Sequence, residues 1–137
     1  WPSGAHANTF GGNPISCAAA LATIRLIEGG YMQNAARMGE RFAERLKRMQ
    51  PEHRSMGDVR GLGLMVGIEL VKDRDTKEPA ADLREAVVQK CFERGLLILG
   101  CGMSTARFMP ALSITADLVD AGLDVFEEAL TEAEREV

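Results

Sequence analysis

Three stretches of this sequence carry residue types that can bind or position a small ligand. The first runs from Gly4 to Pro14 and places Thr9 just before two glycines and the start of an expected helix. A hydroxyl and unobstructed backbone N–H groups at a helix N-terminus are the donors that a phosphate binds. A glycine-rich turn that ends in a helix cap has the same composition, and the residues alone favour that simpler interpretation.

The second stretch, residues 57–70, is rich in glycine but does not fit a dinucleotide-binding loop. Three residues rather than two precede its last glycine, and it leads into a strand pattern rather than a helix. The glycines are typical of points where a strand bends. Asp58 and Arg60 are expected to form a surface ion pair, and we interpret the stretch as scaffold.

The third stretch places Arg107 on a short strand beside a turn. The planar guanidinium of arginine presents a fixed fork of donors to a carboxylate, a geometry that lysine does not reproduce. The alternative is that Arg107 pairs with an acidic residue of its own protein.

Two helices are expected to precede the strands. Asn13 can cap the first, Pro14 suits its first position, and Gly29–Gly30 should end it. Its apolar residues lie on nearly every side, so it needs neighbours all round. The second helix should end at Pro51, and its apolar face is formed by Tyr31, Ala35, Met38, Phe42, Leu46 and Met49.

The rest of the chain alternates strands and helices. Residues 56–71 predict a strand pair or one long bent strand, and residues 73–80 a surface loop. Asp82 and Glu85 resemble a capping box for a helix that runs to about Arg94 and stops at Gly95. Short strands are expected at 96–99 and 106–109. Thr115 should cap a last helix whose apolar face is formed by Leu118, Val119, Leu123, Phe126 and Leu130.

This order predicts an α/β chain of two-layer, α+β-like type, with a small, mainly antiparallel sheet covered on one face by helices. The net charge of -4 is spread along the chain, which argues against a nucleic-acid partner. No apolar run is long enough to span a membrane. We expect three reduced cysteines in a cytoplasmic protein, and, because no initiator methionine opens the sequence, a fragment of a longer polypeptide.

Two further residue types are interpreted as structural. His6 and His53 are expected to be polar loop groups rather than metal ligands, because neither has a carboxylate or a second imidazole at useful spacing. The methionines are expected to fill core positions.

From Gly4 to about Ala129 the sequence resembles the class III pyridoxal-phosphate-dependent aminotransferases, through the three stretches in the expected order. The resemblance implies that Thr9, with Phe10 beside it, binds the phosphate of a pyridoxal 5'-phosphate held mainly by the other subunit of a homodimer. It implies that Arg107 meets a substrate carboxylate or a glutamate that shields it. Ala111 departs from the family, which usually has a second proline there, and leaves the substrate class open.

The resemblance also implies a domain organisation. Residues 1–30 would end the large cofactor-binding domain of a fold-type I enzyme, and residues 31–137 would form its C-terminal small domain. The Schiff-base lysine is expected upstream of Trp1, since Lys47, Lys72, Lys77 and Lys90 do not match the family's lysine segment. No catalytic residue is therefore expected in the fragment, which alone should be inactive.

The implied reaction transfers an amino group from an omega-amino acid or related amine, of 4-aminobutyrate or acetylornithine type, to a 2-oxo acid such as 2-oxoglutarate. The motifs do not separate this from a racemase or aminomutase of the same family. A third alternative is a non-catalytic dimerisation or folding module.

Overall fold

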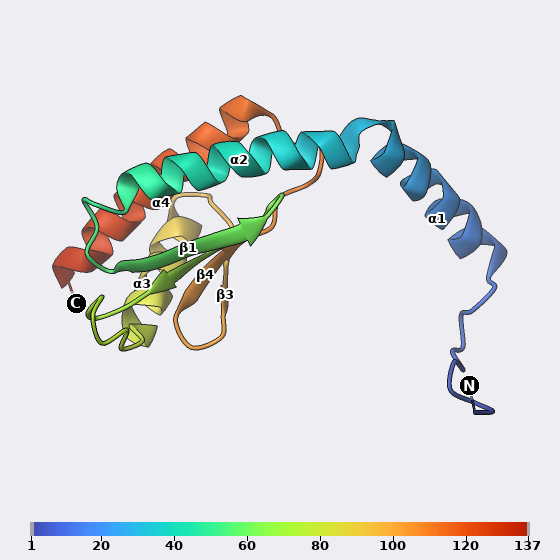
Figure 1. Ribbon diagram of the computed structural model, residues 1–137, viewed down its shortest axis with the longest axis horizontal. Helices are drawn as coiled ribbons and strands as arrows, with labels where there is room; N and C mark the ends of the chain where they lie inside the picture. Colours follow the sequence, from blue (N-terminus) through green and yellow to red (C-terminus); the bar gives the residue numbers. More distant parts are fainter. Residues whose placement is uncertain (1, 137) are drawn as a thin grey trace. The chain divides into compact units, whose positions relative to one another are not determined.

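The structure is a computed structural model that describes residues 2–136, and Trp1 and Val137 lie outside the described residues. The chain divides into two compact units, one up to Met32 and one from Gln33. Its elements, shown in Figure 1, are α1 (Pro14–Leu26), η1 (Ile27–Tyr31), α2 (Met32–Met49), β1 (Met56–Leu62), β2 (Met65–Leu70), α3 (Ala81–Glu93), β3 (Leu99–Cys101), β4 (Thr105–Phe108) and α4 (Ala116–Glu136).

Helix α1 begins as the sequence predicts. The side-chain oxygen of Asn13 accepts hydrogen bonds from the N–H groups of Ile15 and Ser16, at 3.0 and 3.1 Å, and Pro14 takes the first helical position. None of its residues is buried. Its apolar side chains therefore find no core within their own unit.

The predicted stop at Gly29–Gly30 is wrong. Instead, one turn of π-helix, η1, joins α1 to α2, and the N–H of Met32 donates to the carbonyl of Ile27, five residues back. Gly30 has φ 141°, a conformation that side chains disfavour, so the glycine lets the helical path continue through a kink.

The four strands form one antiparallel sheet in the order β1-β2-β4-β3. Strands β1 and β2 are a hairpin, so of the two predicted alternatives the strand pair is confirmed. Gly63 in the turn has φ +54°, and α2 packs closely on it: a Cβ at Gly39 would lie 2.2 Å from the Gly63 carbonyl oxygen. Only glycine fits this contact between helix and hairpin.

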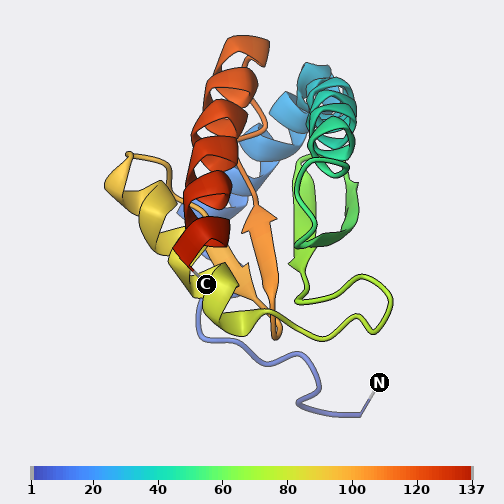
Figure 2. The ribbon, with the colours of Figure 1, turned by 90° about the vertical axis from the view of Figure 1, so that its left-hand side faces the viewer.

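The core lies on one face of the sheet, which α2, α3 and α4 cover (Figure 2). Phe108 of β4 stands between Phe42 of α2 and Phe126 of α4, with ring centroids 5.4 and 5.3 Å away. Aromatic pairs at this spacing stabilise a core beyond the area they bury. Outside the core, Arg41 of α2 pairs with Asp120 of α4 at 2.5 Å, so the two helices lie side by side.

Three local predictions are wrong. Strand β3 begins at Leu99 rather than at Leu96, because the apolar run alone does not mark its start. Asp82 does not cap α3, whose N-cap is Ala80 without a side-chain hydrogen bond. Leu118, predicted to lie on the apolar face of α4, is 62% exposed and is not part of the core, whereas the adjacent Val119 is buried.

The methionine prediction holds only in part. Met49 and Met56 are buried. Four others are more than half exposed: Met32, Met65, Met103 and Met109. Within residues 2–136, none of the helices combines the length and apolar character that crossing a bilayer requires.

Candidate functional site

The face of the sheet opposite the core carries polar residues in two rows. Antiparallel pairing places Arg60 opposite Gly67 and Gly67 opposite Arg107, which sets these three residues in one row. The next row holds Asp58, Glu69 and Thr105. Directly opposed residues of an antiparallel sheet point to the same side, so both rows share the face without helices.

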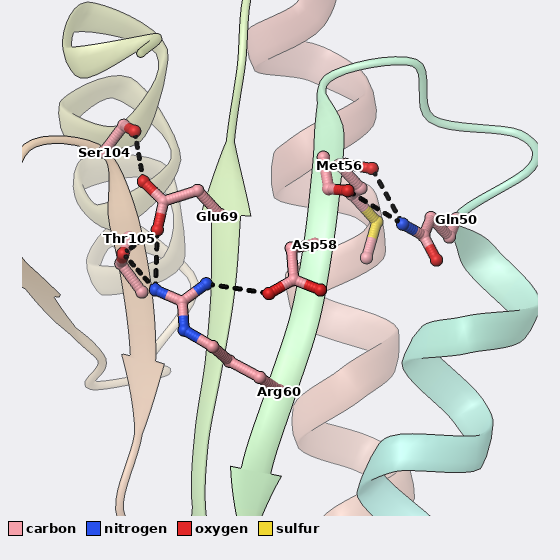
Figure 3. A network of polar contacts seen from close by, with 8 residues as sticks. Gln50, Met56, Asp58, Arg60, Glu69, Ser104 and Thr105 are labelled. Carbon is pink, nitrogen blue, oxygen red and sulfur yellow. Dashed lines mark hydrogen bonds and ion pairs between the residues drawn. The ribbon is translucent and has the colours of Figure 1, made fainter. Parts of the chain in front are cut away.

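Figure 3 shows a polar network centred on Glu69 of β2. Its carboxylate accepts hydrogen bonds from the Ser104 hydroxyl at 2.6 Å and from the Thr105 hydroxyl, and the Arg60 guanidinium lies 2.7 Å from it. Arg60 also donates to Asp58 at 3.0 Å, as predicted, and to the Thr105 hydroxyl at 3.3 Å. The network ties β1, β2 and β4 together across the open face.

Hydrogen bonds and ion pairs within this network favour the charged forms of Glu69 and Arg60. Burial acts to raise the pKa of Glu69, but the three hydrogen bonds that its carboxylate accepts hold the pKa below its usual value. The hydrogen bond to Glu69 in turn raises the pKa of Arg60. Both groups are therefore charged at neutral pH, and the positive charge of Arg60 is already balanced.

Arg107 differs from Arg60 although both lie on the same face. It is half-buried in β4, and its Nε atom is buried without a hydrogen-bond partner in the described chain. An unpaired buried donor costs roughly 1–3 kcal/mol. The alternative prediction was that Arg107 pairs with an acidic residue of its own protein. Within residues 2–136, Arg107 forms no ion pair. Within the described chain no carboxylate balances the charge of Arg107.

Thr9 and Phe10 lie in the exposed loop before α1. Thr9 lines a surface depression together with His6, Ala7, Asn8 and Gly11. Phe10 is 77% exposed. Thr9 belongs to the first compact unit and Arg107 to the second. That the two residues hold one cofactor–substrate pair stays a prediction.

His53 shows where sequence spacing misled us. It is buried, and its Nδ1 lies 2.7 Å from a carboxylate oxygen of Glu134, which also accepts a hydrogen bond from Ser55. His53 does lie in the loop between α2 and β1, as expected. The expectation that it has no carboxylate partner is wrong, because the partner lies 81 positions away in the sequence. Residues 2–136 hold no group of three side chains suited to a metal ion.

Two of the four lysines are held by acidic side chains. Lys90 of α3 lies 2.8 Å from both Glu132 and Glu136 of α4, and Lys72 lies 2.7 Å from Glu78. Ion pairing raises the pKa of both amines, so they stay protonated and poorly nucleophilic.

Sequence reasoning missed Glu69, Ser104 and Thr105 as members of the site. Strand alternation around Ile68 does place Glu69 on the face away from the core. The pairing of β2 with β4 was needed to bring Ser104 and Thr105 beside it.

Comparison with known proteins places these features in a family. Residues 1–130 match the family model described as Aminotransferase class-III. The chain is 42% identical over 130 residues to a leucine/methionine racemase of Thermococcus litoralis, covering 94% of this chain and 29% of the relative. It is 44% identical over 125 residues to a 4-aminobutyrate aminotransferase of Mycobacterium leprae, covering 89% and 28%.

A solved structure agrees. A Bacillus anthracis aminotransferase superposes with a TM-score of 0.86 at 39% identity, over 93% of this chain and 30% of that one. The chain thus spans a little under a third of the length of the proteins it matches.

Proposed function

The chain belongs to the class-III aminotransferase family, and from this we propose that it is part of a pyridoxal-5'-phosphate-dependent enzyme. The proposed reaction moves an amino group from an omega-amino acid or related amine, of 4-aminobutyrate or acetylornithine type, to a 2-oxo acid such as 2-oxoglutarate. The observation that carries the proposal is that Arg107, on a sheet face that no helix of its unit covers, has no acidic partner within residues 2–136.

The loop before α1 fits the phosphate of the cofactor. Thr9 offers an exposed hydroxyl, and the depression it lines ends at Gly11, where no side chain hinders the backbone. A Cβ at Gly11 would lie 2.9 Å from the Asn8 side-chain oxygen, so the Asn8 side chain would have to move aside for a larger residue. We assign the phosphate contact to Thr9 and a flanking contact to Phe10.

In the proposed mechanism this chain binds and orients, while the cofactor supplies a carbonyl that takes up the amino group and a ring that accepts electrons. Arg107 holds the substrate carboxylate with paired hydrogen bonds and so fixes the reacting carbon relative to the cofactor. Lys72 and Lys90 are ion-paired and protonated, and neither they nor Lys47 and Lys77 match the family's lysine segment. We therefore assign the proton-moving amine to a lysine outside residues 1–137.

The proposed domain assignment gives residues 1–30 to the end of a large cofactor-binding domain and residues 31–137 to a small C-terminal domain. The exposed apolar side chains of α1 support it, since Ile15 is 81% exposed and Leu21 56% exposed. Such a helix requires a covering surface. We assign that surface to the large domain and to the second subunit of a homodimer.

The carboxylate role of Arg107 is tested in the full-length enzyme with the variant Arg107→Lys. We expect KM for carboxylate substrates to rise much more than KM for simple amines, because lysine loses the bidentate contact. Equal effects on both substrate classes would instead show a structural arginine.

The phosphate role of Thr9 is tested by Thr9→Ala. The loss of one charge-assisted hydrogen bond should cost roughly 1.5–3 kcal/mol of cofactor binding. Equilibrium dialysis of the cofactor measures this, with Ser3→Ala, in the same exposed loop region, as the matched loss of a hydroxyl. Unchanged cofactor retention in Thr9→Ala would remove Thr9 from the site.

A second candidate function is amino acid racemisation, favoured by the 42% identity to a leucine/methionine racemase. Chiral analysis of amino acids incubated with the full-length enzyme separates the two functions. Transamination requires a 2-oxo acid and produces one. Inversion of configuration without a 2-oxo acid would establish the racemase.

We also propose that residues 1–137 alone do not transaminate. Addition of pyridoxal 5'-phosphate to this chain should give no stoichiometric absorbance band that one Lys→Ala change abolishes. Such a band would contradict the assignment of the reactive lysine to another part of the enzyme. If residues 1–137 bind no cofactor but still associate with the rest of the enzyme, that result would support the third alternative, a non-catalytic dimerisation or folding module.

A further inference from the structure

A cavity of about 620 Å³ opens at one end of the second unit. Its walls come from the segment after α2, the end of β2, the start of α3 and the last turns of α4. These segments lie together at one end of the sheet in Figure 1. The cavity shares no residue with the two polar rows of the open sheet face, and its volume is in the range of small-molecule pockets.

One wall of the cavity is held in place by a buried polar cluster. The carboxylate of Glu134 accepts a hydrogen bond from the Ser55 hydroxyl and lies 2.7 Å from Nδ1 of His53. His53 and Ser55 are only 6% and 9% exposed. The N–H of Val71 donates to the Ser55 carbonyl at 2.8 Å, which joins this wall to the end of β2. The cavity is therefore preformed on this side.

The floor of the cavity is apolar. It is formed by Val71, Ala80 and Leu83, all of which are buried. An apolar group that covers this floor removes apolar surface from water, which favours binding. The cavity therefore suits a ligand with a large apolar part.

Charged side chains surround this floor, and they differ in whether they are paired. Glu134 is engaged by Ser55 and His53, and Lys72 lies 2.7 Å from Glu78. Three other lining side chains form no hydrogen bond or ion pair within residues 2–136: Glu52, Arg54 and Asp82. The cavity thus offers a ligand one positive group and two negative groups that its own unit does not pair.

We propose that this cavity is a binding site for a zwitterionic amino acid with a large apolar side chain. The apolar side chain lies on the floor, Arg54 binds the carboxylate, and Glu52 and Asp82 attract the ammonium group. A ligand with a carboxylate alone would meet two unpaired negative groups and one positive group, so the ammonium group is part of the requirement. The proposal does not depend on the reaction proposed above, because none of the lining residues is assigned to the cofactor or the substrate.

Equilibrium dialysis of α-methylphenylalanine against the full-length enzyme tests the proposal. This amino acid has no hydrogen on the carbon that carries the amino group, so the enzyme neither racemises nor transaminates it. Three analogues each lack one feature: 3-phenylpropanoate lacks the ammonium group, 2-phenylethylamine lacks the carboxylate, and 2-aminoisobutyrate lacks the apolar side chain. We expect the first two to bind roughly two- to fivefold more weakly, the range of one exposed ion pair, and the third at least about tenfold more weakly.

The variant Arg54→Gln removes the proposed carboxylate contact. It should weaken binding of α-methylphenylalanine roughly two- to fivefold and leave binding of 2-phenylethylamine unchanged, because that amine has no carboxylate. Arg48→Gln is the matched control, since Arg48 is an exposed arginine that does not line the cavity, and it should change neither affinity. Binding at the cofactor is recognised separately, because it alters the absorbance of the cofactor and should be the same in both variants.

The proposal is overturned if α-methylphenylalanine shows no saturable binding beyond that which alters the absorbance of the cofactor. It is also overturned if 3-phenylpropanoate or 2-phenylethylamine binds as tightly as the amino acid, since the cavity would then select a single charge. Unchanged affinity in Arg54→Gln, or an equal loss in Arg48→Gln, would likewise remove Arg54 from the site and refute the proposal.

Discussion

Helices α1 and α4 are both rich in apolar residues, yet they end in opposite environments. Helix α1 buries none of its residues. Helix α4 buries six: Val119, Leu123, Phe126, Ala129, Leu130 and Ala133. The apolar residues of α4 gather in one stripe that the sheet covers, whereas those of α1 face all directions. Whether a helix is buried within its own unit therefore depends on how its apolar residues are distributed around the helix, and not on how many there are.

This contrast also separates the two proposed binding residues. Thr9 precedes the helix without a core of its own, and Arg107 lies on a strand between buried neighbours, Ala106 and Phe108. A phosphate contact at Thr9 then depends on surfaces outside its unit. The proposed carboxylate contact at Arg107 would instead be positioned by residues of its own unit.

The largest expected effect comes from the core of the second unit. Phe126→Ala removes a fully buried ring in contact with Phe108 and should lower the free energy of unfolding of the chain by about 3–5 kcal/mol. Leu21→Ala in α1 should change it by less than about 0.5 kcal/mol. Urea denaturation measures both. A comparable loss in the two variants would show that α1 has a core in this chain after all.

Cysteine labelling sharpens the same contrast. Burial raises the pKa of Cys91 to about 11, so its thiol is protonated as well as inaccessible at pH 8. Cys17 of α1 is exposed. In the isolated chain of residues 1–137, iodoacetamide at pH 8 should modify Cys17 at least about a hundredfold faster than Cys91, because the thiolate is the nucleophile. Peptide mass mapping over time gives both rates, and equal rates would contradict the burial of Cys91.

A pair of glycine substitutions probes one position in each unit. Gly39→Ala forces a Cβ against the backbone of Gly63 and should destabilise the chain by about 1–3 kcal/mol. Gly29→Ala in η1 meets open space, so it should be neutral or stabilise the helix by up to about 1 kcal/mol. Melting temperatures rank the variants. A neutral Gly39→Ala would mean that the helix and the hairpin are not in contact.

The smallest expected effect is the loss of the α1 cap. Asn13→Ala frees the N–H groups of Ile15 and Ser16 and should cost about 1 kcal/mol, confined to α1. Amide hydrogen exchange should quicken in α1 and remain the same in α4. A change in α4 would show that the two units unfold together.

The sequence predicted those features that depend on near neighbours. Asn13 and Pro14 marked the start of α1, and the spacing of Phe42, Leu46 and Met49 marked the buried face of α2. The small antiparallel sheet under helices is confirmed. Each of these follows from interactions within a turn or from periodicity, which a sequence displays directly.

Features that depend on distant partners were missed. Glu134 meets His53 across 81 positions, and Ser104 meets Glu69 across 35. No spacing rule links such residues. Part of the site could be predicted: Arg107 was selected for its chemistry, whereas the ion pair of its neighbour Arg60 with Glu69 became clear only when β1 was paired with β2.

The close packing of Gly39 on Gly63 has a consequence for anyone who inserts tags or probes into this domain. An insertion in the β1–β2 turn would push α2 away from the sheet, and with it Phe42 and Leu46. The exposed loop between β2 and α3 has no packing contact of this kind around Asp75 and Thr76, whose N–H groups donate to the Asp73 carboxylate. A fluorophore or epitope placed there should leave both the core and the arginine row intact.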